Sequence, residues 1–256
     1  MTRMTALEGL FHRVWKPRVA SGMVLMLACV GAHAQSLPTP GHGTPLRLVS
    51  ILALDRPVMV QEKLLLDVLF SRAGVGYTLE TVPAERALVD FRNGTYDGDV
   101  NRIATFSQSH PEAVRVDPHV QSAFFYAVGV AQGPLPAGWS DLTPYRVAYV
   151  RGFKGIEIRT AGVAHREVAN SDESCLRMAQ ARRVDWCVLP ADRKNEWPMR
   201  SDFGAELTGA LLDAVKVHIW LGPQHRELAQ TLSRTLRDLE RSGSLGRIMG
   251  TFRQAD

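Results

Sequence analysis

Residues 83–102, PAERALVDFRNGTYDGDVNR, constrain the fold more than any other stretch of the chain. Apolar side chains recur at helical spacing from Ala87 to Phe91, and Asn93-Gly94 predicts a left-handed end to this helix. Tyr96 to Val100 then predicts a buried strand made largely of small residues. A short amphipathic helix that leads directly into a buried strand is an αβ unit.

The residues before this unit predict a strand, a helix and a second strand. Leu46–Leu52 is a largely apolar run, and Tyr77–Val82 alternates as a half-buried strand does. Val58–Ala73 predicts a helix that ends at Gly74. The side chains expected on its inward face are Leu64, Leu65, Val68 and Leu69. Together with the unit above, the order is β-α-β-α-β, which is typical of an α/β fold with a parallel sheet covered by helices.

A second α/β half comes after a loop rich in glycine and proline at residues 132–144. Its predicted elements, and the apolar runs on either side of it, are Ala123–Val130, Arg146–Val150, Arg166–Ala169, Ser174–Arg183, Val184–Leu189 and Lys216–Leu221. The last helix carries leucines at 228, 232, 236 and 239 on one stripe. The length of 256 residues allows one or two domains.

Residues 1–34 have the pattern of a secretory signal peptide. Basic residues precede the apolar run Val19–Val30, which ends in the A-x-A site at Ala32-His33-Ala34. That run is shorter than the roughly 20 apolar residues that span a bilayer. We therefore expect cleavage and a periplasmic protein that begins at Gln35. The alternatives are a retained anchor, or lipid attachment at Cys29.

Loss of this segment changes what the charge implies. It carries four basic residues and one acidic residue, so its removal lowers the formal charge from +4 to about +1. No basic block with interleaved aromatic residues remains. We therefore expect no nucleic-acid partner.

Two cysteines, Cys175 and Cys187, remain in the exported chain. A helix that starts near Cys175 descends about 12 Å before the chain turns, and the strand that returns to Cys187 climbs about 13 Å. The two sulfur atoms would then lie level, so a disulfide is expected in an oxidising compartment. The alternative is two buried free thiols.

Signatures of common catalytic chemistry are missing from the sequence. It has no phosphate-binding P-loop, no dinucleotide-binding glycine motif, no H-E-x-x-H and no G-x-S-x-G. Asp97-x-Asp99-x-Asn101 starts like a calcium loop, but Arg102 stands where glycine is needed. We therefore expect no cofactor, no metal ion and no enzymatic activity.

Residues in the loops at predicted strand ends, most of them polar, form the candidate ligand site. They are Asp55, Arg56, Asn101, Arg102, Arg151, Gly152, Phe153 and Lys154. Strand ends at one edge of an α/β sheet are where such folds bind ligands. An arginine fork suits a carboxylate or phosphate, and the loop at 151–154 opens a helix whose N–H groups would take an anion. The alternatives are an ion pair of Arg102 with Asp97 or Asp99, and a solvated basic turn.

Three motifs in order resemble periplasmic solute-binding proteins of the amino-acid-binding type, family 3. They are P-x-x-R-A followed by N-G-x-x-D-G-D, the run C-L-R-M-A-Q-A-R-R-V-D, and L-x-R-S-G-S-L-G-R-I near the end. The resemblance implies a type II periplasmic-binding-protein fold of two α/β lobes joined by two crossing strands. Lobe 1 would comprise residues 35–125 and 215–256, and lobe 2 residues 126–214.

The function that the resemblance implies is capture of a small polar or zwitterionic solute, with amino acids among the candidates. A monomer would close its lobes on the solute and present it to the membrane permease of an ABC importer. The family's T-x-x-R element is not matched, because Thr105 is followed by Gln108 at that spacing. Asp192 is the nearest match for the acid that holds an amino group.

Two other functions stay open on the same scaffold. An exported, dehydratase-like enzyme would use Glu85, Asp97, Asp99 or Asp172 as general acid or base. A ligand sensor would report lobe closure to a membrane partner instead of delivering its solute.

Overall fold

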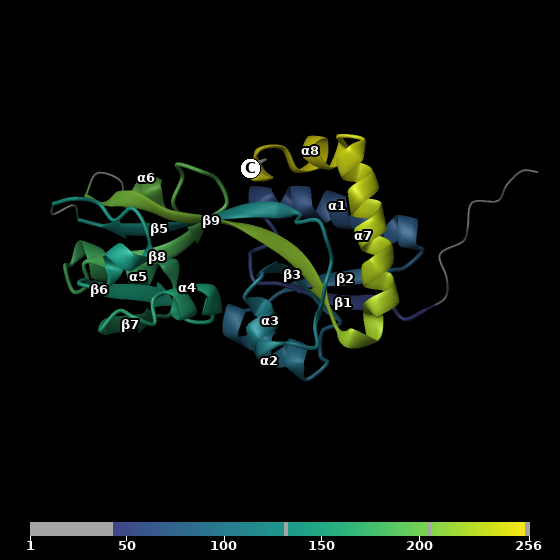
Figure 1. Ribbon diagram of the computed structural model, residues 1–256, viewed down its shortest axis with the longest axis horizontal. Helices are drawn as coiled ribbons and strands as arrows, with labels where there is room; N and C mark the ends of the chain where they lie inside the picture. Colours follow the sequence, from purple (N-terminus) through teal and green to yellow (C-terminus); the bar gives the residue numbers. More distant parts are fainter. Residues whose placement is uncertain (1–42, 131–132, 204–205, 254–256) are drawn as a thin grey trace, which may run out of the picture. The chain divides into compact units, whose positions relative to one another are not determined.

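The computed structural model describes residues 43–130, 133–203 and 206–253, and Figure 1 shows the arrangement of their elements. The predicted signal peptide, Cys29 and the start at Gln35 lie outside the described residues. The first elements alternate as the sequence predicts: β1 (Leu46–Ser50), α1 (Pro57–Ala73), β2 (Tyr77–Thr81), α2 (Ala84–Arg92), β3 (Gly98–Ile103), α3 (Phe106–Ser109) and β4 (Val114–Arg115).

The remaining elements comprise a second α/β series and a C-terminal helical segment. The series consists of β5 (Gln121–Gly129), η1 (Trp139–Leu142), β6 (Arg146–Val150), α4 (Lys154–Arg159), β7 (His165–Ala169), α5 (Asp172–Gln180), β8 (Trp186–Ala191), α6 (Arg200–Phe203) and β9 (Thr208–Leu221). The C-terminal segment contains η2 (Pro223–His225), α7 (Arg226–Arg241), α8 (Ser244–Met249) and η3 (Gly250–Phe252).

One mixed sheet of nine strands carries both series, in the order β2-β1-β3-β9-β5-β8-β6-β7, with β4 paired to β9. Strand β1 lies parallel to β2 and β3, and β6 lies parallel to β7 and β8. The long strands β5 and β9 pair with each other in antiparallel fashion and join the two parallel groups (Figure 1). We call the group around β1 the first lobe and the group around β6 the second lobe.

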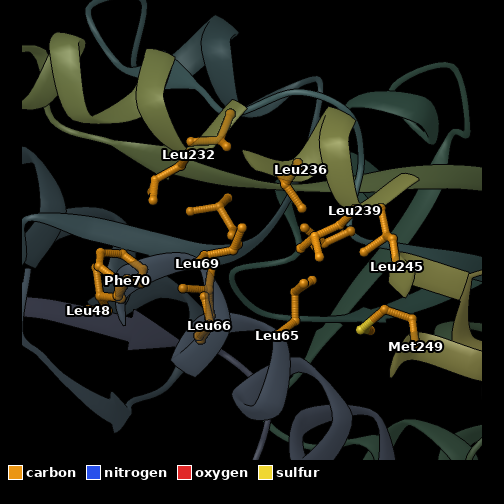
Figure 2. Packing of buried hydrophobic residues seen from close by; sticks show 14 of the residues in the cluster. Leu48, Leu65, Leu66, Leu69, Phe70, Leu232, Leu236, Leu239, Leu245 and Met249 are labelled. Atoms are coloured by element: carbon orange, nitrogen blue, oxygen red, sulfur yellow. The ribbon is translucent and has the colours of Figure 1, made fainter. Parts of the chain in front are cut away.

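The core of the first lobe is a layer of leucines between α1 and the C-terminal helices α7 and α8. Figure 2 shows Leu65, Leu66 and Leu69 of α1 together with Leu232 and Leu236 of α7, and all five are fully buried. Full burial of one such side chain stabilises the fold by about 1.5–3 kcal/mol. Residues far apart in the sequence therefore complete one core.

One of the predictions for the inward face of α1 is wrong. Leu64 is 52% exposed, whereas Leu65 and Leu66 are fully buried. Three successive leucines span about 200° around a helix, which is more than one buried face can hold. The buried face runs through Val58, Leu65 and Leu69, and Leu64 points away from it.

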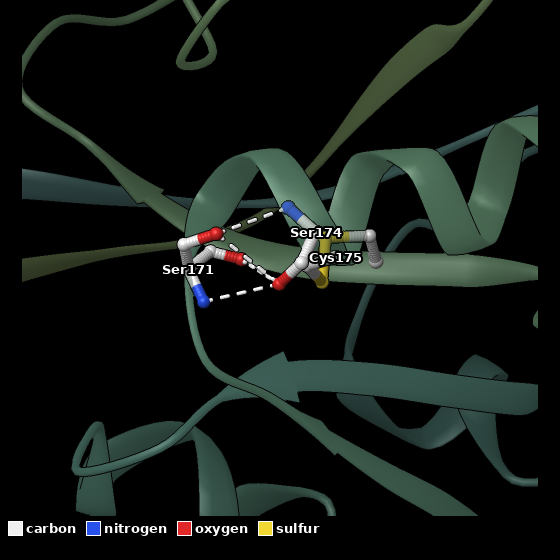
Figure 3. The surroundings of a disulfide bond; sticks show 4 residues. Ser171, Ser174 and Cys175 are labelled. Atoms are coloured by element: carbon white, nitrogen blue, oxygen red, sulfur yellow. Dashed lines mark hydrogen bonds between the residues drawn. A yellow bond between two sulfur atoms is a disulfide. The ribbon is translucent and has the colours of Figure 1, made fainter.

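In the second lobe, α5 is fastened to β8 by a disulfide. The sulfur atoms of Cys175 and Cys187 are bonded, and the two Cα atoms lie 5.6 Å apart. Figure 3 shows the bond beside the start of α5, where Ser171 and Ser174 form a capping box in which each hydroxyl accepts from the other residue's backbone N–H.

Among the described residues, no helix is both long enough and apolar enough to cross a membrane.

Candidate functional site

A cleft lies where the two lobes meet β5 and β9; it holds about 80 Å³ of space for water-sized molecules and is partly open to solvent. The cleft wall is formed by residues of the β1–α1 loop, of β3 and α3, of the crossing strands, and of the loop before α4. Much of the wall is apolar; its larger apolar members include Leu52, Ile103, Phe106, Phe125, Phe153 and Ile156. The cleft therefore offers a solute apolar contact beside a smaller set of polar side chains.

The structure brings five of the eight predicted ligand residues into this wall: Arg56, Asn101, Arg102, Phe153 and Lys154. The other three lie outside it. Asp55 and Arg151 are exposed, and Gly152 is buried against the first lobe. The residues at the predicted strand ends thus divide between the cleft and the surrounding surface.

Arg102 is paired inside its own lobe. Its Nε donates to Asp99 Oδ2 at 2.6 Å, and its Nη2 donates to the carbonyl oxygen of Ala84 at 3.2 Å. The guanidinium carbon lies 5.5 Å from the centre of the Phe106 ring. Asp99 is fully buried, so removal of either partner would leave a buried charge uncompensated. The ion pair weighed against ligand contact is therefore present, although Arg102 also borders the cleft.

Arg56 joins the two lobes across the cleft. Its Nε and Nη2 both donate to Asp192 Oδ2, at 3.2 and 2.7 Å. Arg56 precedes α1 in the first lobe, whereas Asp192 follows β8 in the second. The nearby carboxyl of Asp172 has a raised pKa because burial disfavours its charge; the charge of Arg56 opposes this shift, and that of Asp192 adds to it. Asp172 and Asp192 thus form an acidic pair beside Arg56.

The loop before α4, where the sequence predicts an anion site, uses most of its donors within the second lobe. The backbone N–H groups of Arg151, Phe153 and Lys154 donate to carbonyl oxygens within the second lobe. Lys154 Nζ donates to Glu157 at 2.7 Å. These three N–H groups and the Lys154 ammonium are thus used by the fold itself, and α4 is only six residues long.

Two glycines of this region make close contact with the first lobe. A Cβ on Gly152 would lie 2.4 Å from the backbone N of Glu85, and its φ of 90° already favours glycine. A Cβ on Gly155 would lie 2.5 Å from Ile103 Cδ1. The two lobes therefore approach each other closely at these two positions because glycine has no side chain.

Glu62, which the sequence analysis missed, lies fully buried behind the cleft wall. Its Oε2 accepts from Asn101 Nδ2 at 2.7 Å and from Gln121 Nε2 at 2.9 Å, and both amides line the cleft. Burial raises the pKa of this carboxyl to about 8. A sequence signal existed: Glu62 stands at helical spacing from Val58, Leu65 and Leu69, on the apolar face of α1.

None of the four carboxylates considered for catalysis lines the cleft, although Asp99 and Asp172 lie close to residues that do. Glu85 is exposed, and Asp99 is consumed by its ion pair. Asp97 precedes β3 and accepts from the backbone N of Arg47 at 2.8 Å, at the amino end of β1. The strand begins only at Gly98, so Asp97 lies at the amino end of β3 and not at the end of the strand that borders the cleft.

No group of His, Cys, Asp and Glu side chains within the described ranges is suited to a metal ion. Asp97 and Asp99, which look like a calcium loop in the sequence, have separate partners in the structure.

Comparisons with known proteins identify the fold. No protein-family model matches the chain, and no curated protein sequence matches it. Among solved structures, a histidine kinase sensor domain with similarity to periplasmic binding proteins is 14% identical with a TM-score of 0.65, over 81% of this chain and 95% of that one. The ligand-binding core of GluR0 in complex with L-glutamate is 11% identical with a TM-score of 0.66, over 84% and 100%.

A periplasmic binding protein of an arginine transport system from Legionella pneumophila is 11% identical with a TM-score of 0.61, over 82% of this chain and 100% of that one. At these identities the similarity shows the fold. The chain has the two-lobed α/β fold of periplasmic binding proteins, as the sequence predicts.

Proposed function

We propose that the chain captures a small organic solute in the cleft outside the cytoplasm, closes its lobes around it, and delivers it to the membrane permease of an ABC importer. The observation that carries this proposal is the shared cleft, whose wall is contributed by both lobes and both crossing strands. Export is supported by the basic and apolar pattern of residues 1–34. Solute-binding proteins of arginine transport systems are among the structures of similar fold.

The wall supports a solute with an apolar body and a small number of polar groups. Arg102 and Lys154 are paired within their own lobes, and Arg56 is paired with Asp192. A strongly charged solute would have to compete with these internal partners. Amino acids with apolar side chains remain candidates. Asp192 could release Arg56 and bind the ammonium group of such a ligand, while Arg56 binds its carboxylate.

We further propose binding without chemical conversion. None of Glu85, Asp97, Asp99 and Asp172 lines the cleft. A general acid or base must come within hydrogen-bond reach of the proton that it moves. The positions of these four carboxylates support capture over the dehydratase-like alternative.

A second candidate function is ligand sensing. A histidine kinase sensor domain is among the structures of similar fold, and this chain holds its lobes together with its own ion pair. A sensor needs a defined ligand-free state that a ligand can replace. Import and sensing differ in the step after binding, so a cell-based measurement separates them.

The test is a thermal-shift screen of the chain secreted into the periplasm, against amino acids, small organic acids, polyamines and sugars. A compound at 100 times its dissociation constant adds about 2.7 kcal/mol, which raises Tm by several degrees. We expect a saturable shift with the compound recovered unchanged. Recovery of a converted compound would favour the enzyme, and no shift with any compound would contradict capture of these solute classes. Loss of uptake in cells that lack the chain would then favour import over sensing.

A further inference from the structure

A buried polar network connects the first lobe to the cleft wall. Ser50 Oγ donates to Asn101 Oδ1, and Asn101 Nδ2 donates to Glu62 Oε2 at 2.7 Å. Gln121 Nε2 donates to the same Glu62 oxygen at 2.9 Å. Glu62 itself lies on α1 and is fully buried, whereas Asn101 and Gln121 belong to β3 and β5 and line the cleft.

We propose that Glu62 is the positioning residue of the cleft, which fixes the side-chain amides of Asn101 and Gln121 and so decides which hydrogen-bonding groups they present to a solute. This inference rests on the proposed binding function. Glu62 does not line the cleft itself, so it acts through the two amides.

The orientation is set by the chemistry of an amide side chain. Each amide has one carbonyl acceptor and one NH₂ donor, and a rotation of 180° exchanges them. Because Gln121 Nε2 is held by Glu62, Gln121 Oε1 is the group left for a solute; it has no hydrogen-bond donor among the described residues. The cleft floor therefore presents an acceptor, and the matching solute carries an N–H or O–H group there.

The charge state of Glu62 makes this arrangement possible at neutral pH. Burial is the largest cause that raises its pKa to about 8; the hydrogen bond from Asn101 lowers it, and the negative charges of Asp99 and Asp192 raise it. Those two carboxylates are themselves paired, with Arg102 and Arg56. No cation within the described ranges forms an ion pair with Glu62. Below its pKa the carboxyl is neutral, so the wall carries no uncompensated charge.

The raised pKa of Glu62 fixes the sign of the pH effect on stability. The folded chain holds the Glu62 proton over a range in which the unfolded chain, with a value near 4.5, has released it. The stabilising contribution of this proton is complete below about pH 4.5 and is lost as the pH rises toward 8. Above that value an unpaired negative charge lies behind Asn101 and Gln121.

The variant Glu62→Gln separates position from charge. Its carbonyl oxygen can accept from both amides as Oε2 does, and its NH₂ would occupy the place of Oε1, which has no hydrogen-bond partner. Glu62→Met has a similar length but offers no comparable acceptor, so it releases both amides. Glu62→Gln thus keeps the positioning contact, and Glu62→Met removes it at the same site.

The test is ¹⁵N–¹H correlation spectroscopy of the ligand-free chain, with the two side-chain signals assigned by their loss in Asn101→Asp and Gln121→Glu. In the wild type we expect both NH₂ signals to be protected from solvent exchange and to shift with an apparent pKa near 8. Glu62→Gln should keep the protection and abolish the titration. Glu62→Met should speed exchange about tenfold or more.

A second measurement is the dependence of Tm on pH. Glu62→Gln should exceed the wild type in Tm by a margin that grows from pH 5 to pH 8, because it has no proton to lose. Unprotected amides in the wild type, or equal protection in Glu62→Met, would overturn the positioning role. Because these readouts use no solute, they are independent of the ligand screen. Failure of the screen alone would contradict capture of the screened solute classes and leave the positioning contact established.

Discussion

Replacement of Arg56 by glutamine removes the ion pair that joins the two lobes across the cleft. Two guanidinium donors meet one carboxylate oxygen, at 3.2 and 2.7 Å. Its side chains are still 32% and 20% exposed, so water screens much of the Coulomb attraction. A net contribution of about 1 kcal/mol is therefore reasonable, at the upper end for exposed pairs.

In a chain with open and closed arrangements, this amount changes their ratio about fivefold. Arg56→Gln and Asp192→Asn should each shift the ligand-free chain toward the open arrangement by that factor. The double variant should add little, since either change alone removes the pair. The coupling in a double-mutant cycle should be about 1 kcal/mol.

The assay is pulsed electron–electron resonance between spin labels at two exposed positions, Val89 on α2 and Val168 on β7. Lys63→Gln is the matched control, because Lys63 lies on α1 close to Arg56 in the sequence but pairs with Asp67 within its own helix. Unchanged distance distributions in Arg56→Gln, or equal changes in the control, would refute the view that this pair stabilises the closed arrangement.

Three further predictions concern stability and closure. Loss of the Cys175–Cys187 bond, in the double serine variant, should cost about 3 kcal/mol and lower Tm by roughly 6–12 °C in a chain of this size, measured by calorimetry. Leu236→Ala opens a cavity in a fully buried layer and should cost about 3 kcal/mol by urea unfolding; a loss below about 1 kcal/mol would contradict the packing. Gly155→Leu should leave Tm nearly unchanged but widen the label distance, because even its Cβ would meet Ile103 at 2.5 Å; an unwidened distance would show that the lobes yield there.

The sequence predicts the elements of the first lobe well because local signals agree with the fold. The spacing of apolar residues located α1, and Gly74 ends that helix in the left-handed conformation that the sequence predicts, with φ 67°. Leu64 was placed wrongly because three consecutive leucines give no unique helical face. Their assignment requires the partner helices α7 and α8, which lie some 160 residues away in the chain.

The site is less predictable, because its wall depends on which partner each polar group finds. The order of residues around Asn101 and Arg102 places them near a strand end, but only the fold shows that Asp99 holds the guanidinium. The N–H groups of Arg151, Phe153 and Lys154 looked free in sequence and are bonded in the lobe. Glu62 lies 39 residues before its partner Asn101, and no local pattern reveals that contact.

The most direct test of solute capture is isothermal titration calorimetry with the compound that gives the largest thermal shift. The matched variant is Ala123→Phe, because Ala123 is a half-buried residue of β5 on the cleft wall and its enlargement fills the cleft without a change of charge. We predict one site per chain, an unchanged compound, and at least about a tenfold loss of affinity in the variant at nearly unchanged Tm. Equal affinity in both proteins would place the solute elsewhere and contradict the account.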